Sequence, residues 1–255
     1  YMRVGLQRVG EDLDPAMGFV RRPGIYEVTS FLSHELELQG SSWNEIDFDF
    51  SAGFDADLDW EILSEEYEFD VTFERRRGGE INVGISYERE RFLDDFEIFD
   101  GVIVPVGDFR YTRVFGEVRT PSSWEWGGEV NVSAGEYLGG QRQAVDLSLF
   151  WKPNPVWAAR ITAANARHQP PGGDFDTLVV NSSVQWTPTT SLLLTGDLQY
   201  DNVSEEIGIN GRLRWAVKPG SDVYFVVNQS LVKIGPERRY ESAGREAVAK
   251  VGWTW

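Results

Sequence analysis

The sequence predicts an all-β fold, an antiparallel up-and-down transmembrane β-barrel of about fourteen strands, or the C-terminal part of a larger barrel. Three observations predict it. Apolar and polar residues alternate along almost all 255 residues, short turns alternate with longer connections, and tryptophan gathers beside the short turns. No run of 18 apolar residues exists, which excludes a membrane-spanning helix. We expect a single domain over residues 1–255.

The alternation is clearest over residues 45–59. One face is apolar and consists of Ile46, Phe48, Phe50, Ala52, Phe54, Ala56 and Leu58. Strands of soluble proteins usually have about 5–6 residues. A strand nearly three times as long is typical of a tilted membrane-spanning strand with an extramembrane extension.

Similar segments recur to the end of the chain. We expect strands at 1–9, 24–38, 44–59, 65–74, 80–91, 107–120, 124–137, 142–152, 155–167, 175–187, 190–201, 205–217, 221–232 and 245–255. Their number is even, as bacterial single-chain barrels require.

Turn-forming residues mark the short connections, which we expect at 39–42, 76–79, 121–123, 153–155, 188–189 and 218–220. The connections that alternate with these short turns, several of them longer, are 10–23, 60–64, 92–106, 138–141, 168–174, 202–204 and 233–244. Outer-membrane barrels have short turns on the periplasmic side and longer loops at the cell surface. We therefore expect the short turns and the C-terminus in the periplasm of a bacterium with an outer membrane.

Nine tryptophans lie beside a short turn or the C-terminus, and only Trp60 lies at the other rim. They are Trp43, Trp124, Trp126, Trp151, Trp157, Trp186, Trp215, Trp253 and Trp255. Such an aromatic girdle is typical of the interface between membrane and water, whereas a soluble β-sandwich would scatter tryptophan through its core. The apolar alternation of residues 247–255 also resembles the terminal signal that the outer-membrane assembly machinery reads.

Several segments resemble a bacterial family designated domain of unknown function 5916. They are Leu-Asp-Pro-Ala-Met-Gly-Phe-Val-Arg-Arg at 13–22, Phe-Leu-Asp-Asp-Phe at 92–96, Pro-Val-Gly at 105–107, and Arg-Leu-Arg-Trp-Ala-Val-Lys-Pro-Gly-Ser-Asp at 212–222, which runs on into Val-Tyr-Phe-Val-Val-Asn at 223–228. The resemblance covers essentially the whole chain. It implies an outer-membrane barrel preceded by further strands and by a domain similar to carbohydrate-binding family 9. It supplies no catalytic residues.

Composition excludes some partners and chemistries. The formal charge of −17 disfavours nucleic acid, whose phosphates require a basic surface. Cysteine is absent, which excludes disulfides and thiolate metal sites. We expect outer-membrane lipid, lipopolysaccharide, the assembly machinery and small solutes or ions as partners.

The main chemical feature is acidic. Residues 45–74 contain twelve Asp or Glu and neither Lys nor Arg. Alternation predicts that ten of these carboxylates line the lumen, namely Glu45, Asp47, Asp49, Asp55, Asp57, Asp59, Glu66, Glu68, Asp70 and Glu74. Carboxylates at strand spacing repel one another unless water, cations or arginine screen them. We expect lumen-lining Arg160, Arg212, Arg214 and Lys250 to contribute to that screening. The alternative is a solvated acidic surface without an ion-selecting role.

Three weaker motifs have mainly structural interpretations. Asp94, Asp95 and Asp100 are candidates for calcium in a surface loop, but no cofactor is expected. Gly-Phe-Val-Arg-Arg at 18–22 is a candidate contact for lipid phosphate, although a structural loop is favoured. His168, with Asp174 or Asp176 and Ser182, is the best hydrolase arrangement in the chain, but we interpret His168 as a polar loop residue.

The expected function is that of a porin-like channel for small solutes with an acidic, cation-preferring lumen. One alternative is a non-conducting membrane anchor or assembly scaffold for a periplasmic carbohydrate-binding-like domain or a surface complex. An outer-membrane hydrolase is the other, and we expect no enzymatic activity.

Overall fold

A computed structural model of the chain describes residues 1–13, 23–234 and 239–254. It confirms an all-β fold built on one fourteen-stranded antiparallel sheet. The strands are β1 (Met2–Val9), β2 (Ile25–Glu37), β3 (Trp43–Asp57), β4 (Ile62–Arg75), β5 (Glu80–Phe92), β8 (Gly107–Arg119), β9 (Trp126–Tyr137), β10 (Gly140–Asn154), β11 (Trp157–Gln169), β12 (Phe175–Thr189), β13 (Leu192–Asp201), β14 (Glu206–Lys218), β15 (Ser221–Ile234) and β16 (Arg239–Gly252).

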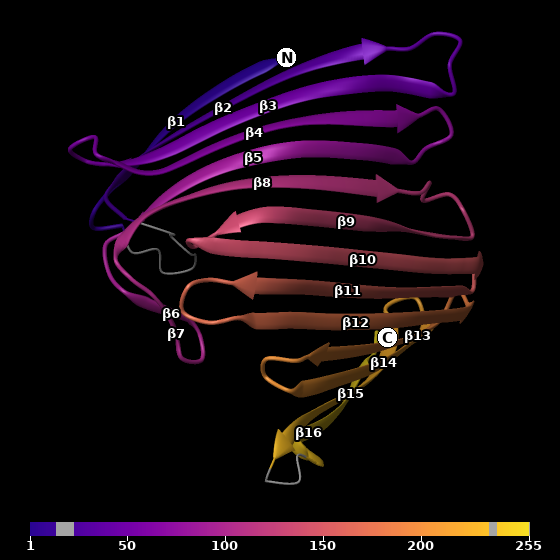
Figure 1. Cartoon of the computed structure of the whole chain (residues 1–255). Helices are drawn as coiled ribbons and strands as arrows, with labels where there is room; N and C mark the ends of the chain where they lie inside the picture. Colours follow the sequence, from indigo (N-terminus) through magenta and orange to yellow (C-terminus); the bar gives the residue numbers. More distant parts are fainter. Residues whose placement is uncertain (14–22, 235–238, 255) are drawn as a thin grey trace. The chain divides into compact units, whose positions relative to one another are not determined.

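The strands follow one another in the sheet in chain order, with β1 at one end of the order and β16 at the other. Two short strands, β6 (Phe96–Phe99) and β7 (Val102–Val104), form a separate hairpin between β5 and β8 (Figure 1). Glycine allows the tightest turns. Gly78 and Gly79, between β4 and β5, have φ angles of 79° and 86°, a region that disfavours other residues.

The fourteen strands predicted for the sheet are confirmed, and two connections and the end of the last strand differ from the prediction. Residues 92–106 contain the β6–β7 hairpin rather than only loop. The connection predicted at 233–244 is much shorter, because β15 reaches Ile234 and β16 already begins at Arg239. The ladder there continues through polar residues, such as Lys233 opposite Tyr240, which give no apolar alternation. The last strand also ends at Gly252 rather than at residue 255.

The chain divides into two compact units. Unit 1 comprises Tyr1–Val118, Asn131–Ala144 and Arg167–Phe175, and unit 2 comprises Arg119–Val130, Val145–Ala166 and Asp176–Trp255. Unit 1 contains two small clusters of buried apolar residues, one of Val9, Ile25 and Leu63 and one around Val104, Tyr111 and Leu138. Within the described ranges, no helix is long and apolar enough to cross a membrane.

Candidate functional site

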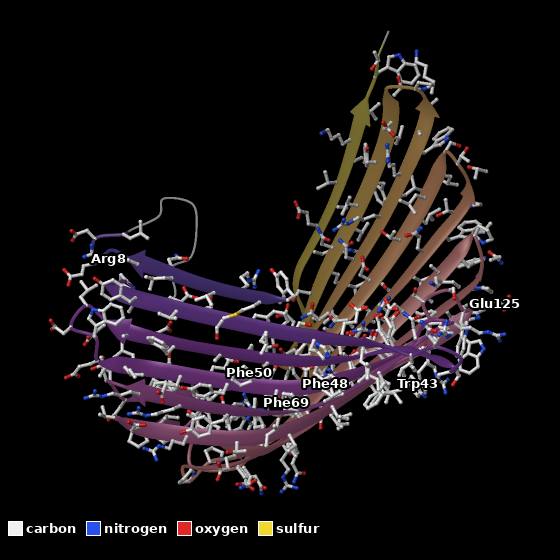
Figure 2. The ribbon with its side chains drawn as sticks, turned by 90° about the horizontal axis from the view of Figure 1, so that it is seen from above. Arg8, Trp43, Phe48, Phe50, Phe69 and Glu125 are labelled. Atoms are coloured by element: carbon white, nitrogen blue, oxygen red, sulfur yellow. The ribbon has the colours of Figure 1, made fainter. Side chains whose placement is uncertain are left out.

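In unit 1, one face of the sheet is apolar and exposed. The pairing register aligns one residue from each of the first five strands in a single row, which reads Met2, Leu32, Phe50, Phe69 and Ile85. All five side chains are between 40% and 70% exposed. Figure 2 labels Phe48, Phe50 and Phe69 on this part of the sheet. We call this surface the apolar face.

Unit 2 has a comparable row. Trp186, Leu194, Leu213, Phe225 and Ala249 are aligned across β12 to β16, and Phe225 is 46% exposed. Within each unit, the predicted grouping of apolar residues on one face is therefore confirmed. His34 is opposite Phe48 and also belongs to the apolar face of unit 1.

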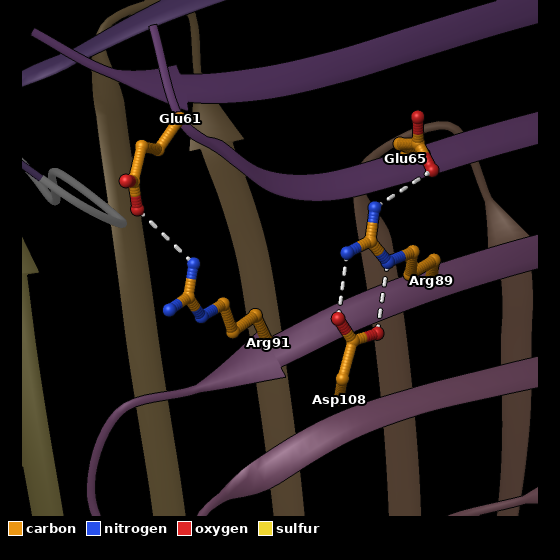
Figure 3. A network of polar contacts seen from close by, with 5 residues as sticks. All are labelled: Glu61, Glu65, Arg89, Arg91 and Asp108. Atoms are coloured by element: carbon orange, nitrogen blue, oxygen red, sulfur yellow. Dashed lines mark hydrogen bonds and ion pairs between the residues drawn. The ribbon is translucent and has the colours of Figure 1, made fainter. Parts of the chain in front are cut away.

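A charged rim borders the apolar face of unit 1 toward the longer connections, and Figure 3 shows the contacts within it. It consists of Glu61, Glu65, Arg89, Arg91 and Asp108. Arg89 holds Asp108 through two nitrogens at 2.8 and 2.6 Å and reaches Glu65 at 3.5 Å, while Arg91 pairs with Glu61 at 3.2 Å. Glu65 is opposite both Phe54 and Arg89, which places the network on the same face as the apolar rows.

The tryptophans gather at the ends of strands, as predicted. Trp43 and Trp157 are the first residues of β3 and β11, and the rings of Trp157 and Trp186 stack at 5.6 Å. Arg8 and Trp43 lie toward opposite ends of the strands of unit 1 (Figure 2). Among the nine tryptophans predicted for the girdle, six are at least 40% exposed, namely Trp124, Trp126, Trp151, Trp157, Trp215 and Trp253. Trp255 lies outside the described residues.

The opposite face of unit 1 is acidic. Register brings Glu45 opposite Glu74 and Asp49 opposite Asp70, and Glu66 and Glu68 point to the same side. The acidic face extends beyond the prediction to the neighbouring strands, through Glu27, Glu35 and Glu37 of β2 and Glu80, Glu88 and Glu90 of β5. One row contains only glutamates, in the order Glu37, Glu45, Glu74 and Glu80. Alternation within β2 and β5 was the sequence signal for these six additional carboxylates.

The partners of the acidic face come from neighbouring strands. Asn82 donates from Nδ2 to Asp70 Oδ2 at 2.6 Å, and Ser64 donates from Oγ to Asp55 Oδ2 at 2.9 Å. Arg113 of β8 forms an ion pair with Glu88. These contacts reduce the repulsion between adjacent carboxylates at three places.

Two of the ten predicted carboxylates have a different role. Asp57 is the last residue of β3, and its Oδ1 accepts hydrogen bonds from the backbone nitrogens of Asp59 at 2.9 Å and Glu61 at 2.8 Å. Asp59 lies in that turn and not on a strand, so its predicted place on the acidic face is wrong. The strand stops two residues earlier than predicted, because the Asp57 carboxylate closes the turn.

The four predicted basic residues lie in unit 2. Arg212 is opposite Thr195, and Arg214 and Lys250 are both opposite Tyr224, so these three share one face. Arg160 donates to Ser148 at 2.8 Å, and Arg214 donates to Asp222 at 3.0 Å. Arg214 thus has an acidic partner on the next strand. The screening of the acidic face by these four residues stays a prediction, whereas Arg113 was not identified from the sequence.

The β6–β7 hairpin packs on the acidic-face side of unit 1. Val104 is buried against Tyr111 and Leu138, with Phe96 and Ile98 partly buried beside them. Tyr111 lies two positions before Arg113 in β8, so both point to the side on which Arg113 meets Glu88. A folded hairpin therefore covers this side of the sheet near the longer connections.

His168 is part of the same packing, and its interpretation as a polar loop residue is wrong. It lies within β11 and is 8% exposed, with its ring stacked on Phe175 at 4.5 Å. Phe175 in turn stacks on Phe99 of the hairpin at 4.5 Å. Asp174 accepts a hydrogen bond from Gln169 at 2.9 Å. The environment of His168 is mainly aromatic.

Asp95, one of the three carboxylates considered for calcium, stabilises the hairpin connection together with Glu97. Asp95 Oδ1 accepts the backbone N–H of Val106, and Glu97 Oε1 accepts that of Gly101, both at 2.6 Å. Across the described ranges, no group of three or more His, Cys, Asp or Glu is arranged to hold a metal ion. The arginine motif at 18–22 lies outside the described residues.

The class defined by this geometry is a long-stranded antiparallel β-protein with an apolar face and a charged face. No protein-family model matches the chain, and a search of the curated proteins found no match.

Proposed function

We propose that this chain forms a transmembrane β-barrel of a bacterial outer membrane, through which small solutes pass in an acidic, cation-preferring lumen. The observation that carries the proposal is the opposition of two faces in unit 1. Aliphatic and aromatic side chains form exposed rows on one side, and carboxylates form rows on the other. A bilayer around a water-filled lumen accommodates both faces.

Energetics favour lipid as the environment of the apolar face. Each square ångström of apolar surface removed from water contributes about 25 cal/mol, and soluble monomers rarely expose large contiguous apolar patches. On β2, the apolar face extends from Leu36 to Ser30, which at about 3.3 Å per residue covers roughly 20 Å. The apolar band of outer-membrane barrels is about 25 Å tall.

Strand number and order are compatible with closure. In an up-and-down order of fourteen strands, the first and last strands run in opposite directions and can pair as antiparallel neighbours. Closure removes two edges whose backbone groups would otherwise be unpaired in lipid. Eight-stranded barrels are filled by side chains and those with 16–18 strands leave a wide channel, so we expect a narrow channel.

The charged rim and the tryptophans fit the two borders of the membrane. In this arrangement, the short turns face the periplasm, and Arg89, Arg91 and their partners lie at the level of the outer headgroups. Lipopolysaccharide and the outer-membrane assembly machinery are the partners that this location implies. The sequence resembles the family designated domain of unknown function 5916, which the resemblance associates with a preceding sugar-binding-like domain. Membership of that family is part of the same proposal.

The hairpin favours a second candidate, a non-conducting anchor or scaffold. Val104 and the aromatic residues around it cover part of the acidic-face side, which narrows any passage along it. Single-channel recording separates the two candidates. We expect discrete conductance steps after the purified chain is folded into planar bilayers. A protein that resists proteolysis in lipid vesicles but conducts no current would overturn the channel and support the anchor.

A further inference from the structure

A hollow of about 620 Å³ lies within unit 2. It is lined from strands β11 to β16 by polar residues that include Asn181, Asp197, Gln199, Asn210, Asn228 and Glu246, and also by Leu198 and Ile209. Its volume is within the range of about 300–1,000 Å³ that is usual for small-molecule sites. We call it the polar hollow.

Two adjacent rows of the sheet build the polar hollow. One row crosses five strands and reads Ser183, Asp197, Asn210, Asn228 and Glu246. The next row reads Asn181, Gln199, Gly208, Ser230 and Gly244. Apart from the two glycines, each residue in these rows has a hydroxyl, carboxylate or amide side chain. Neighbouring strands are about 4.8 Å apart. The result is a regular array of hydrogen-bonding groups.

The two glycines create the depression. A Cβ atom placed on Gly208 or Gly244 would meet nothing within 4 Å, so the floor there is bare backbone. Around it, Asn210 donates to Asn228, while the Oδ1 atom of Asn210 is buried with no hydrogen-bond partner in the described part of the chain. A buried amide oxygen without a partner is costly, and a rotation of the Asn210 side chain would present it to a donor of a bound solute.

We infer that the polar hollow binds a neutral polyhydroxylated solute of about the size of a mono- or disaccharide. Each amide offers a donor and an acceptor side by side, which matches the paired hydroxyls of such a molecule. Asp197 and Glu246 add acceptors for further hydroxyl groups. The bare floor at Gly208 accommodates the flat C–H face of a sugar ring.

The charge balance disfavours ions as the ligand. Two carboxylates and two guanidinium groups line the polar hollow, those of Asp197, Glu246, Arg160 and Arg245. Arg212 lines the adjoining cavity together with Asn210 and Asn228. The opposite charges of these groups largely offset one another, in contrast to the acidic face of unit 1. Hydrogen bonding rather than net charge therefore selects the solute.

This inference rests on the proposed function in one respect, namely that this face of unit 2 is open to water. Its test is an equilibrium binding measurement, which does not require conductance. Maltose serves as the probe, and the folded full chain is kept in a detergent without a sugar headgroup. Saturation-transfer NMR detects the bound disaccharide, and KCl and glycine are titrated as charged competitors.

Two glycines of β14 provide a matched pair of variants. Gly208 faces the polar hollow, whereas Gly211 is opposite Gly196 and Val227 on the other side of the sheet. A Cβ atom added to either glycine would meet no other atom within 4 Å, so both positions have room for a side chain. Gly208→Phe should fill the polar hollow and weaken maltose binding at least about tenfold, while Gly211→Phe should leave binding unchanged. Asn210→Ala should weaken binding by a smaller factor.

Binding of maltose that is lost in Gly208→Phe and retained in Gly211→Phe supports the inference, whether or not the chain conducts current. Conductance without maltose binding would overturn the inference and leave the channel intact. Equal loss of binding in both glycine variants, with both folded, would also overturn it, because the effect would then not depend on the polar hollow. Displacement of maltose by glycine would overturn the choice of a neutral solute and assign the site to a zwitterion instead.

Discussion

Neighbouring residues in β3 belong to opposite faces of the sheet, and their tolerance of charge should differ accordingly. Phe50 lies in the central row of the apolar face, whereas Ser51 is opposite Glu68 on the acidic face. Arginine at the lipid-facing midplane of a barrel costs about 2–4 kcal/mol. Phe50→Arg should therefore lower the free energy of unfolding in lipid vesicles by that amount. Ser51→Arg should change it little, because Arg gains a carboxylate neighbour. Denaturant titration followed by tryptophan fluorescence measures both, and equal losses would refute the assignment of faces.

Arg113 should be coupled energetically to Glu88. Its ion pair lies among other carboxylates, so Arg113→Met leaves Glu88 repelled by Glu66 opposite it. We expect Arg113→Met to destabilise the fold by about 1–3 kcal/mol, with partial recovery in the double variant that adds Glu88→Gln. A double-mutant cycle without coupling would show that the pair contributes nothing.

For single residues, the sequence predicts on which face of the sheet a side chain lies, but not which other side chains it contacts. A period of two assigns Asp47 or Glu68 to a face without knowledge of neighbours, and eight of the ten predicted carboxylates lie on the acidic face. The partners Asn82 and Arg113 depend on register between strands, which alternation does not specify. The prediction for His168 was wrong because Tyr137, whose ring lies 5.4 Å from that of His168, is distant in sequence, and Phe175 gives no signal of its own.

Among the structural elements, the β6–β7 hairpin is the one that was not predicted from the sequence. Asp94, Asp95, Asp100, Gly101 and Pro105 indicate a loop, and these residues do lie outside strands, in the turn of the hairpin or in the segments that join it to β5 and β8. The alternate apolar residues Phe96, Ile98, Val102 and Val104 were the signal for packed strands, but the segment is too short for alternation to stand out. The fourteen long strands were predictable because each repeats the alternation over ten or more residues, except for the eight-residue β1.

Release of the hairpin should widen the proposed channel. Val104 is 3% exposed in the cluster around Tyr111, whereas its neighbour Ile103 is 59% exposed. A buried aspartate is costly without partners, so Val104→Asp should detach the hairpin and increase single-channel conductance. Ile103→Asp should leave the conductance unchanged. Proteolysis of the connection in the Val104 variant confirms detachment. If the connection is cleaved but conductance does not rise, the hairpin does not restrict the passage.

For the whole molecule, orientation follows from the two kinds of connection. The chain contains no cysteine, so single cysteines provide clean labelling sites. Asp95→Cys, before the hairpin, should react with a membrane-impermeant maleimide in intact cells, and Ser122→Cys, in a short turn, should not. The proposed orientation requires this difference. Labelling of Ser122→Cys alone would reverse it.

The central claim is a water-filled passage lined by the acidic face, and the reversal potential across a KCl gradient tests it most directly. Carboxylates along the passage accumulate cations, most strongly at low salt, where the Debye length is about 30 Å at 0.01 M. We predict a cation-side reversal potential that decreases in the triple variant Asp47→Asn, Asp49→Asn and Glu68→Gln. A control that removes the same charge from connections, Glu11→Gln, Asp12→Asn and Asp59→Asn, should retain it. Anion preference, or equal selectivity in all three proteins, would contradict the account.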